Sequence, residues 1–183
     1  MLERGTRSLE FAALQASPSA TPLPLETPPA IKVAVQFDRL RQPSQWEAWR
    51  FSLTGVLLDE GQFGSEPRTL RDDGQTATTL HPGLPVSLHR DEAEGYYLNL
   101  SSGAPVWFVM WRVKEDDPSG CGPEFVTLSY HEAGRLLDAQ ERVDNVPMPV
   151  NVRDWLQAFT DEHYRPEPKQ RRRPASFRAP DQR

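Results

Sequence analysis

Hydrophobic and polar residues alternate along several stretches in the middle of the chain. Apolar side chains occupy every second position in residues 31–37 and again in residues 84–88. Residues 49–57 repeat the pattern with Trp49, Phe51, Leu53 and Leu57. A period of two places successive side chains on opposite faces of a strand, so each stretch predicts a β-strand with one face against a core. Residues 106–111 are apolar at every position, which predicts either a central strand or a strand at a surface that another element covers. Residues 125–130 predict a further strand.

Short connections join the strands expected within residues 84–113. Five residues precede the apolar positions of residues 96–100, and five residues follow them. Connections of this length are typical of hairpins, so the stretch predicts an antiparallel meander in which residues 96–100 are a strand and Pro82-Gly83 is a turn before it. Because successive side chains of a strand point to opposite faces, Tyr97 and Asn99 are expected on an exposed sheet face that suits a protein partner.

The apolar period changes to 3.6 in the last third of the folded part. Residues 133–137 carry a short helical stripe, and residues 152–159 carry a longer one at positions i, i+3, i+4 and i+7. Two prolines in residues 146–149 exclude a helix there and predict an extended connector over the surface. The expected fold is therefore α+β and mainly β, an antiparallel barrel or sandwich of about six or seven strands closed by two C-terminal helices.

Composition divides the chain of 183 residues into three parts. Residues 1–30 are rich in Pro, Ala, Ser and Thr, which predicts a disordered arm, and residues 31–164 form a single folded domain with all tyrosines and all tryptophans. Residues 165–183 form a Pro/Arg-rich tail that is basic, although the whole chain carries a net charge of −5. Neither a run of about 18 apolar residues nor a signal-peptide core is found, so we expect a cytoplasmic protein.

The residues that could carry chemistry have simple structural roles available to them. Ser129 and Glu132 stand in a capping-box spacing before the first helical stripe, although His131 beside Glu132 is also an acid/base or metal-ligand candidate. Asn151 and Asp154 suggest a second helix cap. The single cysteine, Cys121, is expected on a polar loop as a bystander, and the acidic residues 91, 92 and 94 are expected in a solvated hairpin loop. The chain has no dinucleotide, P-loop or esterase motif, so we predict no catalytic residue, no metal site and no cofactor.

The basic tail is the strongest electrostatic feature of the sequence. Prolines extend the chain beyond the last helix, and a block of arginines follows. Such a block binds polyanions, although the acidic folded part counts against nucleic acid. The residues expected to contact a partner there are Arg165, Lys169, Arg171, Arg172 and Arg173.

Several strings of the sequence together resemble one family of small bacterial proteins, a domain family of unknown function. They are YYLNL (96–100), VWFVMWR (106–112), VTLSYHEAGRLLD (126–138), VDNVPMP (143–149) and YRPEPKQRRRPASF (164–177). Genes of this family in Gram-negative bacteria often lie beside those of molybdenum-dependent formate dehydrogenase. The resemblance spans residues 31–177 and assigns no catalytic or binding residue.

The resemblance implies a role beside a metalloenzyme. The expected function is that of a non-catalytic accessory protein that assists assembly, maturation or regulation of a formate dehydrogenase by contact with one of its subunits or maturation factors. Two alternatives stay open at this point: a cofactor-handling enzyme of the molybdopterin pathway, and a nucleic-acid-binding protein that acts through the basic tail.

Overall fold

The computed structural model describes residues 27–44 and 47–166, and this part of the chain forms seven strands and three α-helices. The helices are α1 (Ala93–Leu100), which follows a 3-10 turn η1 (Arg90–Glu92), then α2 (Tyr130–Asp138) and α3 (Val150–His163). The strands are β1 (Ala30–Arg41), β2 (Trp49–Leu58), β3 (Arg68–Asp72), β4 (Thr76–Ser87), β5 (Val106–Val113), β6 (Cys121–Thr127) and β7 (Arg142–Pro147).

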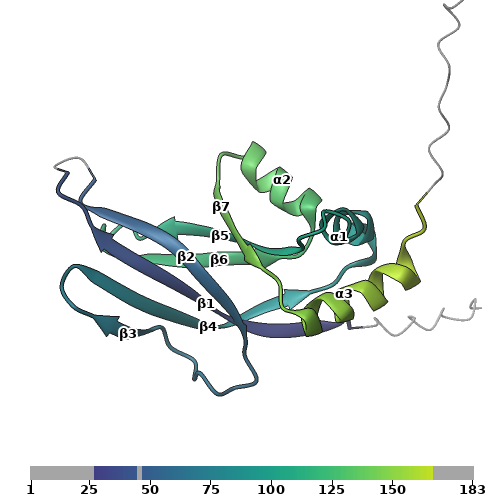
Figure 1. Ribbon diagram of the computed structural model, residues 1–183, viewed down its shortest axis with the longest axis horizontal. Coiled ribbons are helices and arrows are strands. Elements are labelled where there is room, and N and C mark those ends of the chain that lie inside the picture. Colours follow the sequence, from purple (N-terminus) through teal and green to yellow (C-terminus); the bar gives the residue numbers. More distant parts are fainter. Residues whose placement is uncertain (1–26, 45–46, 167–183) are drawn as a thin grey trace, which may run out of the picture.

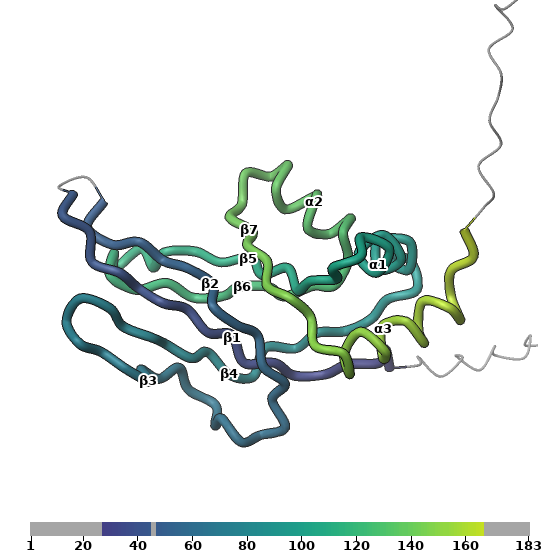
Figure 2. The backbone as a smooth tube through the Cα atoms, in the orientation of Figure 1, coloured from purple at the N-terminus to yellow at the C-terminus, as the bar shows by residue number. Residues whose placement is uncertain are grey.

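The strands form two antiparallel sheets (Figure 1). The first sheet has the order β2-β1-β4-β3, and the second has the order β6-β5-β7. The long strands β1 and β4 run side by side from one end of the first sheet to the other (Figure 2). The expected mainly β, antiparallel architecture is confirmed, but the described residues form no closed barrel, because β2, β3, β6 and β7 each pair with a strand on one side alone.

One hydrophobic core is shared by both sheets. The apolar side chains of β1 that were expected to point inward are buried, and the alternate side chains of β5 meet them. The ring of Phe37 lies 5.6 Å from the ring of Trp111, which links the centre of one sheet to the centre of the other. The core residues of these two strands are Val33, Val35, Phe37, Trp107, Val109 and Trp111.

The three helices gather toward one end of the sheets (Figure 1). α2 and α3 are the two helices that the sequence predicts, and α3 buries Val152, Leu156 and Phe159 in the shared core. α1 packs against both of them, and its Tyr96 ring lies 6.0 Å from the ring of Phe159. The helices therefore cover the core where the strands end.

The predicted strand at residues 96–100 is wrong, because these residues belong to α1. Ala93, Tyr96 and Asn99 are buried at a spacing of three, which is the spacing of one helix face. The apolar positions 96, 98 and 100 suggested a period of two, but Leu98 is 39% exposed. A pattern of five residues is too short to separate the two periods, and burial of a polar Asn side chain was not anticipated.

The predicted turn at Pro82-Gly83 is also wrong, because β4 continues through it. The pairing of β4 with β1 shifts register between Val33 and Val35, and Gly83 takes a positive φ of 81° there. The backbone N–H of Gly83 donates to Oδ2 of the buried Asp59 at 2.9 Å. The Pro-Gly pair thus makes a bulge inside a strand and does not end it.

Two strands were not predicted as strands. All five residues of β3 are exposed, so this strand has no alternating apolar pattern. β7 was expected as a surface connector, but its backbone pairs with β5 and Val146 is buried. Its Pro147 stands at the last position of an edge strand, where no N–H is needed.

The basic residues of the tail from Lys169 onward, and residues 1–26 of the expected arm, lie outside the described residues. Within the described part, no helix has both the length and the apolar character that crossing a membrane requires.

Candidate functional site

An open groove lies where the first residues of β2 face the first residues of β7. Its volume is about 1120 Å³. The two strands are neighbours, although they belong to different sheets. We call this depression the aromatic groove and define it by five of its lining residues: Trp49, Phe51, Trp111, Arg142 and Asp144.

The side chains of the aromatic groove hold one another in place. The indole Nε1 of Trp111 donates to Oδ2 of Asp144 at 2.8 Å, and the guanidinium of Arg142 lies 5.3 Å from the centre of the Trp111 ring. The guanidinium of Arg39 lies 4.5 Å from the Trp49 ring. Cations over aromatic faces are attracted by the ring quadrupole, so these contacts favour the ring orientations seen here.

Some of the charged side chains that line the aromatic groove already form ion pairs within the protein. Glu141 accepts from Arg112, and the hydrogen bond from Arg112 is the main cause that lowers the pKa of Glu141. Among the described residues, no ion-pair partner lies within 4.0 Å of Arg50 or Arg142. Glu47 also lines the groove, and its carboxylate is in no ion pair with a described residue. Arg50 and Arg142 can therefore pair with acidic side chains of a partner, while Glu47 and Asp144 bring negative charge to the same groove.

Both strands that border the aromatic groove are edge strands. In the described part, β2 pairs only with β1, and β7 pairs only with β5. Each strand leaves alternate backbone N–H and C=O groups of its outer edge for another chain. Such an edge beside aromatic side chains can take up an extended peptide as an added strand.

The structure separates the two residues predicted on an exposed sheet face. Asn99 is 1% exposed, and its side chain bonds to the backbone of Val106 and Leu128. The expectation that Asn99 is exposed is therefore wrong. Tyr97 is half-buried on the same helix, and its ring lies 5.1 Å from the ring of Tyr164.

The basic tail starts beside Tyr97. Arg165 follows the last residue that contacts Tyr97 and is exposed. The predicted partner residues Lys169, Arg171, Arg172 and Arg173 lie outside the described residues. The described chain leaves α3 at the end where the helices gather, whereas β2 begins at the opposite end (Figure 1).

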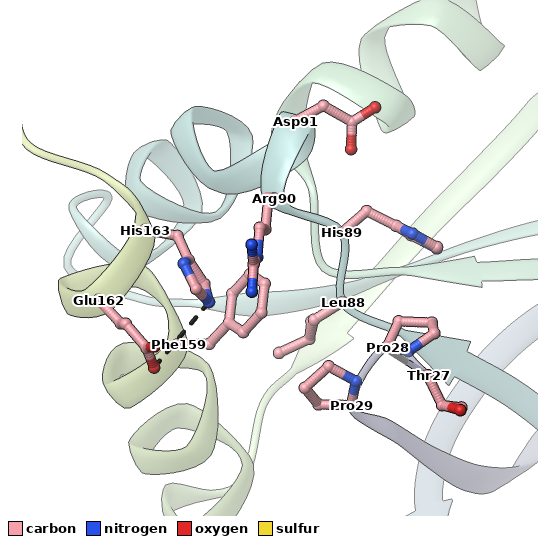
Figure 3. A pocket seen from close by; sticks show the side chains of 10 residues that line it. All are labelled: Thr27, Pro28, Pro29, Leu88, His89, Arg90, Asp91, Phe159, Glu162 and His163. Carbon is pink, nitrogen blue, oxygen red and sulfur yellow. Dashed lines mark ion pairs between the residues drawn. The ribbon is translucent and has the colours of Figure 1, made fainter. Parts of the chain in front are cut away.

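A second open depression, of about 940 Å³, lies between α3 and the segment that joins β4 to η1 (Figure 3). The His163 ring lies 4.3 Å from the Phe159 ring, and its Nε2 lies 3.9 Å from Oε2 of Glu162. Figure 3 shows His89 and Asp91 pointing away from His163. Among the described residues that line this depression, neither His89 nor Asp91 is therefore directed at the imidazole of His163.

The Ser129 cap is confirmed. The hydroxyl of Ser129 accepts from the backbone N–H of Glu132 at 3.1 Å, as a helix N-cap should. The Glu132 carboxylate does not return to the Ser129 backbone as in a full capping box: it accepts from Thr127, and Thr127 Oγ1 accepts from the Ser129 N–H. Glu132 is thereby held in a structural network.

The other predicted cap and the predicted acidic loop are corrected by the structure. α3 begins after Pro149 without a side-chain cap, so Asn151 lies inside its first turn. The acidic residues 91, 92 and 94 belong to η1 and α1, where Glu92 accepts from Ser129 and Arg135. A helix start replaces the expected hairpin because α1 replaces the expected strand.

A small cleft of about 240 Å³ lies between β4 and the hairpin of β5 and β6. We call it the basic cleft and define it by Arg39, Arg68, His81, Lys114 and Cys121. The prediction that Cys121 lies on a polar loop is wrong, because Cys121 opens β6 and is 5% exposed. Burial raises the pKa of the Cys121 thiol to about 12 against the opposing effect of Lys114 and Arg39, so it is a neutral thiol at pH 7.

Sequence reasoning missed both the aromatic groove and the basic cleft as sites. The alternating pattern of residues 49–57 placed Trp49 and Phe51 on one strand face, but it did not show that β7 would lie beside them. Each site combines residues that are far apart in the sequence. The described residues contain no group of three or more His, Cys, Asp or Glu side chains that could hold a metal ion.

Comparisons with known proteins gave one match. The sequence pattern of a family described as "Protein of unknown function (DUF3305)" matches residues 32–173. Neither a curated protein nor a solved structure matches the chain.

Proposed function

The chain belongs to the DUF3305 family of proteins of unknown function, and from this premise we propose that it is a non-catalytic accessory protein that acts by protein–protein contact. The observation that carries the proposal is the aromatic groove between two edge strands of different sheets. Aromatic residues and arginine are enriched where proteins bind one another, and both are present here.

The mode of binding that we propose is strand addition. An extended segment of the partner pairs with the free edge of β7 or β2 and lays its side chains against Trp49 and Trp111. Main-chain hydrogen bonds along an edge give affinity, and the side-chain surfaces beside the edge give specificity. Arg50 and Arg142 favour a segment that carries acidic residues.

The partner that we propose is a subunit of a molybdenum-dependent formate dehydrogenase or one of its maturation factors. This part of the proposal rests on the family resemblance of the sequence, and the basic tail supplies a second contact. The accessory protein would assist assembly, maturation or regulation of the enzyme in the cytoplasm. An accessory role of this kind needs a binding face and no reacting group.

The test is affinity capture of the tagged full-length protein from its native host under conditions that express formate dehydrogenase, with crosslinking and mass spectrometry. We expect specific capture of a formate dehydrogenase subunit or maturation factor, with crosslinks near Trp49 and Arg142. The double variant Arg50→Glu/Arg142→Glu should lose at least about 90% of this capture, because it places like charges against an acidic segment.

Two controls show whether the groove itself makes the contact. Arg153→Glu changes an exposed arginine of α3 outside the groove and should capture the partner normally. A chain that ends at Tyr164 shows how much the basic tail contributes. Capture of no such protein by the full-length chain, or equal capture by the groove double variant, contradicts the proposal.

A further inference from the structure

The basic cleft contains cations that the rest of the described structure does not neutralise. Arg68 at the start of β3 and Lys114 just after β5 both line it. Within the ranges that the structure describes, neither side chain has an ion-pair partner within 4.0 Å. Their charges are therefore available to a ligand.

Arg39 completes the cationic wall. One of its terminal nitrogens donates to the carbonyl of Ser119 at 3.0 Å, and the other lies 3.3 Å from Oδ2 of Asp72. Its Nε is buried and has no hydrogen-bond partner among the described residues. A buried N–H without an acceptor costs stability, whereas the positive charge of the guanidinium adds to that of the other cations that line the cleft.

Of the residues that the structure describes, Asp117 alone brings a carboxylate to the lining of the basic cleft, and this carboxylate is already hydrogen-bonded. Oδ1 of Asp117 accepts from both the backbone N–H and the hydroxyl of Ser119, at 3.0 and 2.6 Å. These hydrogen bonds are the main reason that the pKa of Asp117 is lowered, and the charges of Lys114 and Arg39 lower it further. The described lining thus has three cations and one carboxylate, and one of the cations, Arg39, already pairs with Asp72.

The floor of the basic cleft adds no negative charge. The buried Cys121 is a neutral thiol, and burial followed by the charge of Lys114 lowers the pKa of His81, so the imidazole is neutral at pH 7. Nε2 of His81 lies 3.3 Å from the Thr79 hydroxyl. The floor therefore offers a hydroxyl and an imidazole as hydrogen-bonding groups without competing for the cations.

We propose that the basic cleft binds a phosphate group, with Arg68 and Lys114 as its charge partners and Arg39 and Thr79 as hydrogen-bond donors. The volume of about 240 Å³ is below the range of roughly 300–1,000 Å³ that is typical for drug-sized ligands, so it fits a single small anionic group. The group is either free inorganic phosphate or the phosphate of a small metabolite.

The acidity of the whole chain does not oppose such a site. The net charge of −5 is spread over the whole chain. At physiological ionic strength, salt screens charges that lie more than about 8 Å from the ligand. Inside the cleft, the charges of the nearest side chains determine the electrostatic potential that a ligand meets. This also separates the site from nucleic-acid binding, which needs a long basic surface.

The experiment is isothermal titration calorimetry of the full chain with inorganic phosphate in a phosphate-free buffer of low ionic strength. We expect saturable binding to one site. Arg68→Gln and Lys114→Gln should each weaken it about tenfold or more, because each removes a charged partner of the anion. Arg71→Gln is the matched control, since Arg71 lies on the same strand and pairs with Asp73 outside the cleft.

A second measurement locates the ion even if a variant is unstable. The chain has four histidines, and the imidazole Hε1 signal of His81 should shift during the titration with the same dissociation constant as the calorimetry. No saturable binding, equal loss in Arg71→Gln, or a shift of the other histidines without His81 overturns the proposal. Binding by the arginines of the tail would leave Arg68→Gln and Lys114→Gln unchanged and would overturn it too.

Glycerol 3-phosphate distinguishes the two sources of the group. Tighter binding than inorganic phosphate assigns the site to a phosphorylated metabolite, and equal or weaker binding assigns it to the free ion. Both results support a phosphate site if the two cleft variants weaken the binding.

Discussion

Asn99 makes three hydrogen bonds with its side chain inside the molecule. Its Nδ2 donates to the carbonyls of Val106 and Leu128 at 2.8 and 2.9 Å, and its Oδ1 accepts from the N–H of Val106 at 3.0 Å. These bonds tie α1 to the start of β5 and to the short segment between β6 and α2. A buried amide whose partners are backbone groups is a structural residue, so the same side chain cannot form a binding face.

His81 makes the stability of the fold depend on pH. Burial, and then the charge of Lys114, lowers its pKa below 6.5 in the folded state. The unfolded state therefore binds more protons than the folded state between the two pKa values. His81 costs no stability well above pH 6.5, and it destabilises the fold progressively as the pH falls from there toward the folded-state pKa.

We predict that His81→Gln reduces the loss of stability between pH 7.5 and pH 5. Urea unfolding at both values, in a buffer without phosphate, measures this as a difference between variant and parent. His89→Gln is the control, because His89 is exposed. A loss of stability that is identical in His81→Gln and the parent chain contradicts the prediction.

At the scale of elements, α1 and α2 meet at a glycine. A Cβ at Gly95 of α1 would stand 2.2 Å from Oγ of Ser129 and 3.2 Å from the backbone N of His131. Ser129 caps α2, so the contact joins one helix to the start of the other. Because any side chain at Gly95 displaces this cap, the close approach of the two helices requires glycine.

We predict that Gly95→Ala destabilises the protein by about 1–3 kcal/mol, the usual cost of an overpacked contact. Gly134→Ala makes the same change inside α2, where a Cβ would meet nothing within 4 Å, and should stabilise the protein by about 0.5–1 kcal/mol. Thermal or urea unfolding of both variants checks the opposite signs. If both variants changed the free energy of unfolding by the same amount, the prediction would be contradicted, because the contact of Gly95 with Ser129 would then have no effect of its own.

At the scale of the molecule, two sheets without common backbone pairing act as one unit through their side chains. Phe37 is 1% exposed, and its ring lies 6.0 Å from the ring of His81 and 5.6 Å from that of Trp111. It therefore contacts its own sheet and the other sheet at once. The aromatic groove and the basic cleft both lie against this shared core.

We predict that Phe37→Ala weakens both sheets together and lowers the free energy of unfolding by about 3–5 kcal/mol. Hydrogen exchange should accelerate in β5 as well as in β1, because the cavity opens between them. Leu40→Ala on the same strand, where the side chain is 43% exposed, should change stability by no more than about 0.5 kcal/mol. Faster exchange in β1 alone would show that the two sheets unfold independently.

The sequence by itself determined the elements whose patterns are local and long enough. The alternation of residues 31–37 and 49–57, the apolar run at 106–111 and the helical stripes of α2 and α3 predicted these elements in place, since the residues of each element show its period by themselves. The Ser129 cap was predicted for the same reason, because its partner is three residues away. The family resemblance also came from the sequence.

Only the tertiary structure decided α1, β3, β7 and the two candidate sites. Asn99 is polar and buried because distant backbone groups bond to its amide. β3 forms without a buried apolar face because its backbone pairs with β4. The aromatic groove needs β2 beside β7, and the basic cleft needs Arg39, Arg68 and Lys114 at one place. Such features depend on contacts between segments that are far apart along the chain, and a local periodicity contains no information about them.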